Sequence, residues 1–311
     1  MPQTKVFIDG SAGTTGLKIY DRLSMRNDIH LITLPEELRK TPHARAEAIN
    51  SSDVTFLCLP DAAADESAGL CVNPSTVIID TSTAHRTSPD WTYGFPELTG
   101  YRERIASSKR IANPGCHASG FVSLIAPLTE SCLLPADAII SAYSLTGYSG
   151  GGKKMIADYC DSAAAEALLA PRVYGISGRH KHLPEMVKVC GLAREPLFSP
   201  IVSSYYSGME VVISLYREQL NGTASDIKEL YRSRYSGKIV KYAEGSDESG
   251  FLSASALSGR DDMEIAVFGN DDRITLVSRF DNLGKGASGA AIQNMNIVLG
   301  LDETTGLNTG D

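Results

Sequence analysis

Apolar and polar positions along the first part of the chain separate short strands from amphipathic helices. Short apolar runs alternate with segments whose apolar residues recur at helical spacing. The runs predict strands over residues 5–8, 29–34, 54–59 and 77–80, and the intervening segments predict helices over 17–23, 44–49 and 62–70. This alternation predicts an α/β domain with a Rossmann-type, doubly wound parallel sheet.

The pattern changes after Cys116. A helix is predicted over 118–128, and then come longer segments in which apolar and polar residues alternate. They predict strands over 139–145, 202–215, 239–242, 264–268 and 274–280. Long alternating strands are typical of a mostly antiparallel sheet, so we expect an α+β domain here. Residues 287–301 have helical spacing, and the polar segment 300–311 is expected to be frayed.

The bulk composition excludes some function classes. The 311 residues are 42% hydrophobic and 21% charged, with a formal net charge of −8, which disfavours nucleic acid or an acidic membrane as partner. A small anionic substrate remains compatible, because it needs only local cations. No apolar run reaches membrane-spanning length, and the N-terminus shows no signal-peptide pattern. Six scattered cysteines without a Cys-x-x-Cys pair predict no disulfide framework, no structural zinc site and a cytoplasmic location.

Cys116 is the candidate nucleophile. It follows Asn113-Pro114-Gly115, a rigid corner with little side chain, and it precedes the predicted helix. A thiol at a helix N-terminus is close to unpaired backbone N–H groups and to the positive end of the helix dipole, and both favour the thiolate. The alternative is a buried cysteine that only happens to start a helix.

A glycine-rich turn follows the first predicted strand. The spacing Gly10-x-x-Gly13-x-x-Gly16 between a strand and a helix is typical of a turn that accepts a pyrophosphate, although G-x-G-x-x-G is the commoner form. A plain glycine-rich turn is the alternative. The candidate cofactor-binding residues of the turn are Gly10, Ala12, Gly13, Thr14, Thr15 and Gly16.

The residues alone leave NAD and NADP open. Glu36 lies where an acid that binds a ribose would be expected, but Arg39 and Lys40 follow and could face a 2′-phosphate.

A second group of reactive side chains lies in Gly178-Arg-His-Lys-His-Leu-Pro-Glu185. Histidines at 180 and 182 cannot share one helix face, so a loop or strand edge is predicted. A metal site would need further ligands at suitable spacing, and we expect none. We prefer His182, or else His180, as the acid or base for Cys116, oriented by Glu185. A solvated basic loop is the alternative.

Other polar residues are candidates for binding the anionic substrate. The segment 80–86 carries Ser82 and Arg86 at the end of a predicted parallel strand, where open α/β sheets bind ligands. A second glycine-rich turn begins at Gly147 and supplies Lys153 and Lys154. Asn113, Arg179 and Lys181 complete the set of substrate-binding candidates. A surface salt bridge for Arg86 and a flexible loop for 147–154 are the alternatives.

Four segments carry a family resemblance. Residues 7–16, 113–116, 180–185 and 281–295 closely resemble the N-acetyl-gamma-glutamyl-phosphate reductases, in their shorter form, of the aspartate-semialdehyde dehydrogenase-like superfamily. The resemblance extends over nearly the whole chain. The related aspartate-semialdehyde and glyceraldehyde-phosphate enzymes share the cysteine and the architecture, but their histidine contexts are not found here.

The resemblance implies an NADPH-dependent reduction in arginine biosynthesis. N-acetyl-gamma-glutamyl phosphate would become N-acetylglutamate 5-semialdehyde and inorganic phosphate, through a thioester on Cys116 and with a histidine of the 180/182 pair. It also implies NADP(H) as cofactor and a C-terminal segment, with Asn282 and Gly284, that lines the nicotinamide pocket. The first domain would then be 1–116 with 284–311, and the catalytic and oligomerisation domain 117–283.

Other functions account for part of these residues. An aminoadipyl or aspartyl phosphate reductase would use the same chemistry. A thiol hydrolase would leave the glycine turn without a role, and a non-enzymatic NADP-binding regulator would leave Cys116 without one. The long strands of the second domain suggest a homo-dimer or homo-tetramer.

Overall fold

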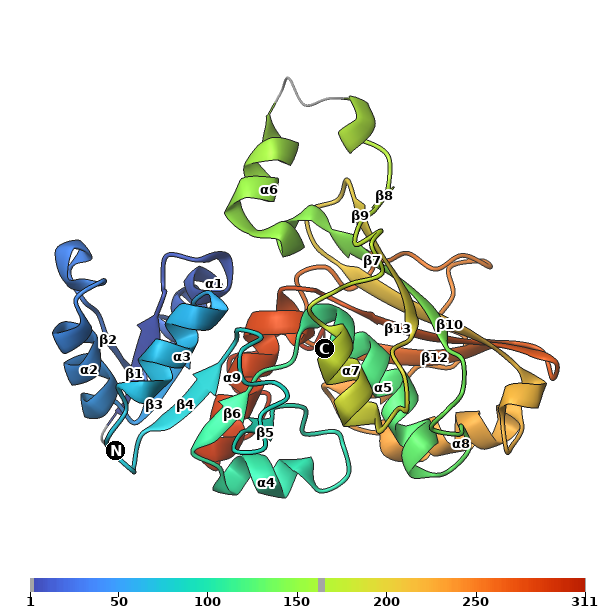
Figure 1. The fold of residues 1–311 in the computed structure, drawn as a ribbon, viewed down its shortest axis with the longest axis horizontal. Coiled ribbons are helices and arrows are strands. Elements are labelled where there is room, and N and C mark those ends of the chain that lie inside the picture. Colours follow the sequence, from blue (N-terminus) through green and yellow to red (C-terminus); the bar gives the residue numbers. More distant parts are fainter. Residues whose placement is uncertain (1–2, 162–165, 311) are drawn as a thin grey trace. The chain divides into compact units, whose positions relative to one another are not determined.

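The computed structural model describes residues 3–161 and 166–310, and it divides the chain into two compact units (Figure 1). Unit 1 comprises Met1–Gly115 and Ala287–Leu307, and unit 2 comprises Cys116–Gly286 and Asn308–Asp311. Each unit has its own sheet. No helix within the described residues combines the length and the hydropathy that a membrane span needs.

Unit 1 is built on a six-stranded parallel sheet. Its strands are, in spatial order, β2 (Ile29–Ile32), β1 (Thr4–Asp9), β3 (Val54–Leu57), β4 (Val77–Asp80), β6 (Arg110–Ala112) and β5 (Thr92–Tyr93). The chain leaves β1 toward β2 on one side and returns to β3 on the other. The carboxyl ends of β1 and β3 therefore form the topological switch point at which open α/β sheets bind ligands.

Helices cover both faces of this sheet. The helical segments are α1 (Thr14–Leu23), η1 (Glu36–Leu38), α2 (Pro42–Ser51), α3 (Asp61–Gly69), α4 (Tyr101–Ser107) and α9 (Gly289–Val298). Buried residues of α1, α4 and α9 pack with those of the strands on one face, and α2 and α3 cover the other. The predicted doubly wound sheet is confirmed.

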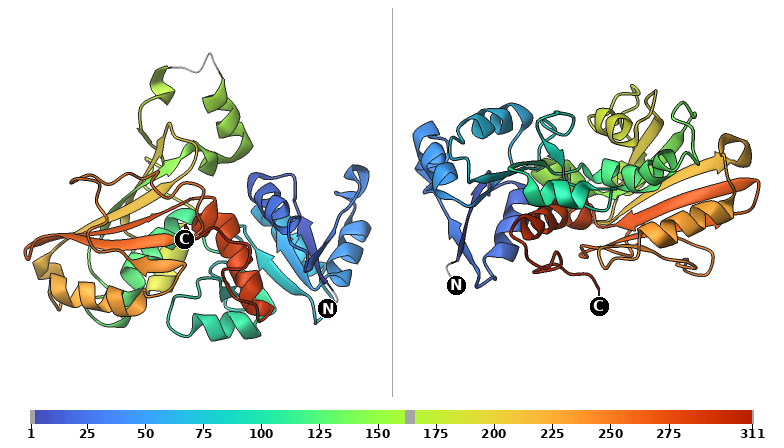
Figure 2. Two further views of the ribbon diagram at one scale, coloured as in Figure 1. Left: turned by 180° about the vertical axis from the view of Figure 1, so that it is seen from behind. Right: turned by 90° about the horizontal axis from the view of Figure 1, so that it is seen from below.

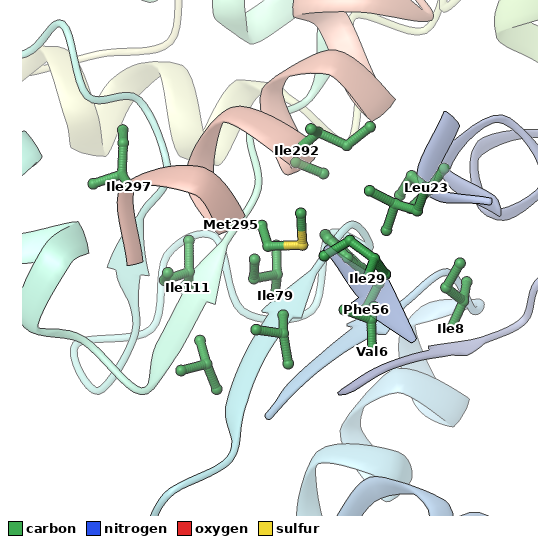
Figure 3. Packing of buried hydrophobic residues seen from close by; sticks show 14 of the residues in the cluster. Val6, Ile8, Leu23, Ile29, Phe56, Ile79, Ile111, Ile292, Met295 and Ile297 are labelled. Atoms are coloured by element: carbon green, nitrogen blue, oxygen red, sulfur yellow. The ribbon is translucent and has the colours of Figure 1, made fainter. Parts of the chain in front are cut away.

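The C-terminal helix α9 completes the core of unit 1. Ile292 and Met295 lie among Val6, Phe56 and Ile79 of the central strands (Figure 3). Seen from behind, the red helix α9 runs beside the sheet (Figure 2). Within the described residues the polar segment 300–310 is anchored rather than frayed, so that expectation was wrong there; Asp311 lies outside the described residues. Arg26 Nη1 donates to the Thr305 carbonyl at 3.3 Å and to Asn296 Oδ1 at 2.8 Å, contacts that a composition-based prediction does not anticipate.

Unit 2 is built on a seven-stranded, mostly antiparallel sheet. Its order is β11 (Val240–Tyr242), β12 (Met263–Gly269), β13 (Arg273–Phe280), β10 (Met209–Tyr216), β7 (Ser141–Gly147), β9 (Leu197–Ser203) and β8 (Arg172–Val173), with β11/β12 and β7/β9 parallel. The helical segments are α5 (Cys116–Glu130), η2 (Tyr148–Gly151), α6 (Gly152–Cys160), η3 (Glu166–Leu168), α7 (Leu183–Cys190), η4 (Arg217–Gln219) and α8 (Ala224–Arg234). A further short segment, η5 (Gly284–Ser288), begins in unit 2 and ends in unit 1. The predicted fold class is thereby confirmed.

One predicted strand of unit 2 was wrong. The pattern over 202–215 predicted a single strand, but the structure has two, β9 and β10, separated by a turn that ends at Gly208. Gly208 has φ +121°, and an added Cβ would lie 2.6 Å from the carbonyl oxygen of Ala254. The turn requires glycine both for its backbone conformation and for this close approach.

We expect Met295→Ala to lower the free energy of unfolding by about 2–5 kcal/mol, because Met295 is fully buried and its removal leaves a cavity. Urea denaturation measures this change. Met25→Ala, at a residue 78% exposed, is the matched control and should change the value by less than about 0.5 kcal/mol. Equal effects of the two substitutions would contradict the inclusion of α9 in this core.

Candidate active site

The glycine turn of unit 1 lies at the switch point of its sheet. Gly10 follows β1 with φ +88°, and an added Cβ would lie 2.3 Å from the Cys58 carbonyl oxygen at the end of β3. An added Cβ at Gly16 would lie 2.4 Å from the Gly10 carbonyl oxygen. The Gly13 N–H donates to the same carbonyl at 3.0 Å, which closes the turn. Glycine is therefore required at positions 10 and 16 by backbone packing.

The first turn of α1 suits an anionic group. Its N-cap residue, Gly13, has no side chain to accept from the first N–H groups, and the first turn contains no acidic residue. A helix N-terminus of this kind accepts a phosphate through its backbone N–H groups. Thr14 and Thr15 are the first two residues of α1, and Ala12 precedes its N-cap residue. These residues fit the pyrophosphate of a dinucleotide.

A buried acid precedes the turn and is neutralised within unit 1. Asp9 Oδ2 accepts from Arg45 Nε at 3.0 Å and from Ser67 Oγ at 2.6 Å. A buried carboxylate needs such a partner, because an isolated charge loses its hydration. The Arg45 pairing thus offsets a negative charge beside the turn.

Arg39 lies beyond the carboxyl end of β2 and is exposed. It follows η1, which contains Glu36, and its Nε donates to the Leu34 carbonyl at 3.2 Å. In doubly wound folds this region faces the adenosine ribose, and an arginine here can accommodate a 2′-phosphate.

The residues at the ends of β4 and β6 form a buried hydrogen-bonded group. Ser82 Oγ and His85 Nδ1 both lie 2.7 Å from Asp80 Oδ2. Arg86 donates from Nε to the Asn113 carbonyl at 2.9 Å and from Nη2 to the Thr81 carbonyl at 3.0 Å. The structure thus brings Ser82, Arg86 and Asn113 to one edge of the unit 1 sheet.

Cys116 is the first residue of α5, as the Asn-Pro-Gly corner predicted. The helix is buried along almost its whole length, from His117 to Leu128. Gly120 allows α5 to approach the sheet, since an added Cβ would lie 2.5 Å from Val211 of β10 and 2.7 Å from Ser278 of β13. The thiol is therefore presented by a rigid element.

Three histidines and a tyrosine gather in unit 2. The ring centroid of His117 lies 5.3 Å from that of His180 and 5.6 Å from that of His182. His117 Nδ1 is 2.7 Å from Ser144 Oγ, and His117 Nε2 is 2.6 Å from Tyr174 Oη. Within residues 3–161 and 166–310, no group of three or more histidine, cysteine or acidic side chains could hold a metal ion.

The second histidine segment is a turn that leads into α7. His182 is the N-cap residue of α7, Pro184 occupies its first turn, and Glu185 is buried in the same turn. Gly178, with φ +72°, precedes the segment. The predicted loop is therefore correct for His180 and His182, while the helix from Leu183 onward was not predicted.

Burial and neighbouring positive charges keep the imidazole rings of His117 and His180 neutral. Burial, followed by the charges of His180 and Lys181, lowers the pKa of His117 to about 3. Burial, followed by the charge of Lys181, lowers the pKa of His180 to about 4. His180 Nδ1 also accepts from the His182 backbone N–H at 3.2 Å, so the neutral ring carries its proton on Nε2. His180 can therefore donate a hydrogen bond from Nε2 but cannot accept a proton there.

The remaining predicted substrate-binding residues lie mostly at the surface. Three of them are exposed: Lys153, Arg179 and Lys181. Gly147 ends β7, where an added Cβ would lie 2.5 Å from the Tyr206 carbonyl oxygen. The positive charge of Lys181 contributes to the lowered pKa values of both His117 and His180.

Asn282 and Gly284 have structural contacts within unit 2. Asn282 Oδ1 accepts from the Gly208 N–H and its Nδ2 donates to Ser149 Oγ, each at 3.0 Å. Gly284 packs against the Arg260 carbonyl, where any Cβ would overlap. Gly286 approaches Cys116, since an added Cβ would lie 3.0 Å from the Cys116 Cβ.

Ser144, His117 and Tyr174 lie in this group but were not predicted as site residues. A histidine that directly follows the candidate nucleophile was the available signal for His117. Ser144 and Tyr174 are 27 and 57 residues from His117 along the chain and carry no motif. Only the fold brings them together.

Two family models match the chain in succession. The semialdehyde dehydrogenase NAD binding domain matches residues 5–108, and the semialdehyde dehydrogenase dimerisation domain matches residues 116–282. Aspartate semialdehyde dehydrogenase II from Vibrio cholerae, complexed with ASA, has a TM-score of 0.72 at 14% identity, over 96% of this chain and 99% of its own. Aspartate semialdehyde dehydrogenase with NADP from Candida albicans has a TM-score of 0.64 at 14% identity, over 96% and 98%. The class is thus that of the semialdehyde dehydrogenases, and the two solved structures support the fold alone.

Two curated relatives identify the family within this class. N-acetyl-gamma-glutamyl-phosphate reductase of Brucella anthropi is 45% identical over 95% of this chain and 98% of its own. The enzyme of the same name from Brucella suis is 44% identical over 95% and 99%. The chain therefore belongs to the N-acetyl-gamma-glutamyl-phosphate reductase family, and the resemblance inferred from its motifs is confirmed.

We expect the rings of His117 and His180 to stay neutral until the pH falls toward 3 and 4, respectively. Unfolded histidine protonates near pH 6.5, so the stability that these rings contribute is complete above that value; it is lost as the pH falls to about 4 for His180 and to about 3 for His117. Long-range ¹H–¹⁵N correlation spectra, assigned with His117→Gln and His180→Gln, report both charge and tautomer. Titration of either ring near pH 6.5 would contradict this assignment.

Proposed function

We propose that this protein reduces N-acetyl-gamma-glutamyl phosphate to N-acetylglutamate 5-semialdehyde and inorganic phosphate, with NADPH as the reductant, in arginine biosynthesis. The observation that carries the proposal is the 44–45% identity to reductases of that name over 95% of the chain, which includes Cys116 and its helix. Aspartyl and aminoadipyl phosphates rank below this substrate, because the aspartate semialdehyde dehydrogenases are only 14% identical and support the fold alone.

The dinucleotide would bind at the switch point of unit 1. The backbone N–H groups of residues 12–15 would hold the pyrophosphate, and Gly10, Gly13 and Gly16 would keep the turn open to it. Arg39 would pair with the 2′-phosphate, which favours NADP over NAD. Asn282 and Gly284 are proposed to support the nicotinamide end of the dinucleotide, because their contacts hold the loop that contains them in place.

Cys116 is proposed to act as the nucleophile. Its thiolate attacks the acyl carbonyl, and the tetrahedral oxyanion receives hydrogen bonds from backbone N–H groups at the start of α5. The C–O bond to phosphate then breaks, phosphate leaves with the electron pair, and the acyl group remains on sulfur as a thioester.

NADPH, when bound, supplies the hydride that reduces the thioester carbonyl. His182 is proposed to protonate the carbonyl oxygen and to take the proton back as the carbon–sulfur bond breaks, which releases the aldehyde and the Cys116 thiolate. His180 is less suited to this role, because its pKa of about 4 keeps the ring neutral near physiological pH, and a neutral imidazole is a weak acid. Glu185, buried in the first turn of α7, is proposed to orient His182.

Cationic and polar residues would hold the substrate's anionic groups. Arg86 and Lys153 are proposed for the phosphate, because a guanidinium fork and a lysine both suit phosphate oxygens. Arg179 and Lys181 are proposed for the carboxylate. Ser82, Asn113 and Gly147 would shape the binding site around them.

We also propose that the enzyme is a homo-oligomer, either a dimer or a tetramer, in the cytoplasm. The matched model of its second domain is described as a dimerisation domain, and the long strands of unit 2 offer a surface for pairing. Its six cysteines are thiols spread along the chain, which suits a reducing compartment.

We expect the purified protein to reduce NADP with N-acetylglutamate semialdehyde over many turnovers only when phosphate is present to release the thioester. Cys116→Ser should lower kcat by about a thousandfold or more, since the acyl acceptor is lost. Cys132→Ser, at an exposed cysteine, is the matched control and should retain full activity. Preference for aspartate semialdehyde would overturn the substrate assignment, and near-normal activity of Cys116→Ser would overturn the covalent scheme.

Arg39→Ala tests the cofactor assignment. We expect kcat/KM for NADPH to fall about tenfold or more, because a charge-assisted contact to the 2′-phosphate is lost, while that for NADH stays unchanged. Arg104→Ala, at an exposed arginine of α4, should alter neither value. Parallel losses with both cofactors would show that Arg39 does not face the 2′-phosphate.

A further inference from the structure

Asp281 directly follows β13 and is a buried acid that receives three hydrogen bonds. Its Oδ1 accepts from the Leu283 N–H at 2.7 Å. Its Oδ2 accepts from the Ser207 hydroxyl at 2.9 Å and from the Gly259 N–H. All three partners are donors, so both oxygens of the side chain must act as acceptors, as those of a carboxylate do.

Asp281 also begins a tight turn that leads back to the candidate nucleophile. The Asp281 carbonyl oxygen accepts from the Gly284 N–H at 3.1 Å and from the Gly286 N–H at 3.0 Å. An added Cβ at Gly286 would lie 3.0 Å from the Cys116 Cβ. The end of the turn over 281–286 therefore packs against the side chain of Cys116.

The same carboxylate ties this turn to two other loops of unit 2. Ser207 lies in the turn between β9 and β10, and Gly259 lies in the segment between β11 and β12. Ser207 Oγ also lies 2.5 Å from Ser258 Oγ, which joins these two loops to each other. The turn over 281–286 is therefore held by a connected network in addition to its own main-chain bonds. Every residue of this network belongs to unit 2.

The network requires an acceptor at each end of the side chain of Asp281. An asparagine has nearly the same shape, but it offers one acceptor oxygen and one NH₂ donor. Either orientation of that amide would turn the NH₂ toward an N–H group, that of Leu283 or that of Gly259. This N–H would lose its acceptor, and the turn would be released from one of its anchors.

We propose that Asp281 is a positioning residue for Cys116. Its carboxylate fixes the turn over 281–286, and the backbone at Gly286, packed against the Cys116 side chain, holds the thiol in the orientation from which it attacks the acyl carbon. Asp281 acts through Gly286 and exchanges no proton with the substrate. The inference rests on the proposed role of Cys116 as nucleophile.

Single-turnover acylation of the intact enzyme tests this role. Enzyme in excess is mixed with N-acetyl-gamma-glutamyl phosphate and saturating NADP, which has no hydride to donate, and the released phosphate is followed with time. We expect Asp281→Asn to lower the acylation rate constant about tenfold or more, because a small displacement of the nucleophile is costly. Circular dichroism at the assay temperature establishes that each variant is folded.

Gly286→Ala tests the same contact from its other side and leaves the carboxylate in place. The added Cβ would lie 3.0 Å from the Cys116 Cβ, so the turn and the Cys116 side chain must move apart. We expect the acylation rate constant to fall about fivefold or more. The double variant is expected to lose no more than the larger of the two single losses, because both substitutions disturb one contact.

Matched controls come from unit 2. Asp271→Asn, at an exposed aspartate between β12 and β13, should leave the acylation rate constant unchanged. Gly237→Ala, at an exposed glycine where an added Cβ would make only ordinary contact, should do the same.

The outcomes separate this inference from the proposed function. Wild-type enzyme that releases no phosphate would overturn both. Release by the wild type at a rate that Asp281→Asn leaves unchanged would overturn the role of Asp281 alone. Single losses that multiply in the double variant would show that Asp281 does not act through Gly286, which contradicts the inference. If Asp281→Asn does not fold, Gly286→Ala decides: the expected loss supports the inference, and an unchanged rate refutes it.

Discussion

The close packing of α5 on the unit 2 sheet is the constraint on which the reactive site depends. Gly120 permits the approach, because any Cβ there would overlap with Val211 and Ser278. The buried helix holds Cys116 at its N-terminus and places the next residue, His117, beside Ser144 of β7. Burial then removes water from His117 and keeps its ring neutral at physiological pH. One packing contact thus sets the position of the thiol and the protonation of its neighbour.

Unit 1 depends on a corresponding constraint at the glycine turn. The Cys58 carbonyl comes so close to Gly10 that the turn admits no side chain, and α1 begins directly afterwards with its first N–H groups uncapped by a side chain. Arg45 neutralises the adjoining Asp9, so negative charge does not accumulate where a pyrophosphate would bind. Each unit therefore places a helix N-terminus, which carries positive potential, at a residue group with a proposed role: the glycine turn in unit 1 and Cys116 in unit 2.

Local signals in the sequence predicted much of this arrangement. Alternation of apolar runs with helical spacing predicted the doubly wound sheet, and Asn113-Pro-Gly predicted Cys116 at a helix start. The turn before Gly208 was missed although its serines and glycine are residues that turns favour, because apolar runs flank it on both sides, and the close approach of Gly208 to Ala254 shows why the strand ends. Ser144, His117 and Tyr174 were missed because their geometry is created by tertiary packing. The hydrogen bond from the His182 N–H to His180 Nδ1, which fixes the tautomer of His180, is likewise encoded by no spacing.

The central claim is that Cys116 carries the acyl group as a thioester. Mixing the protein with N-acetylglutamate semialdehyde and NADP in the absence of phosphate tests it most directly, because the thioester then has no phosphate to accept it. The account predicts a burst of NADPH stoichiometric with active sites and an N-acetylglutamyl adduct on the Cys116 peptide in mass spectrometry, released when phosphate is added. A burst without an adduct, or an adduct on another cysteine, would contradict it.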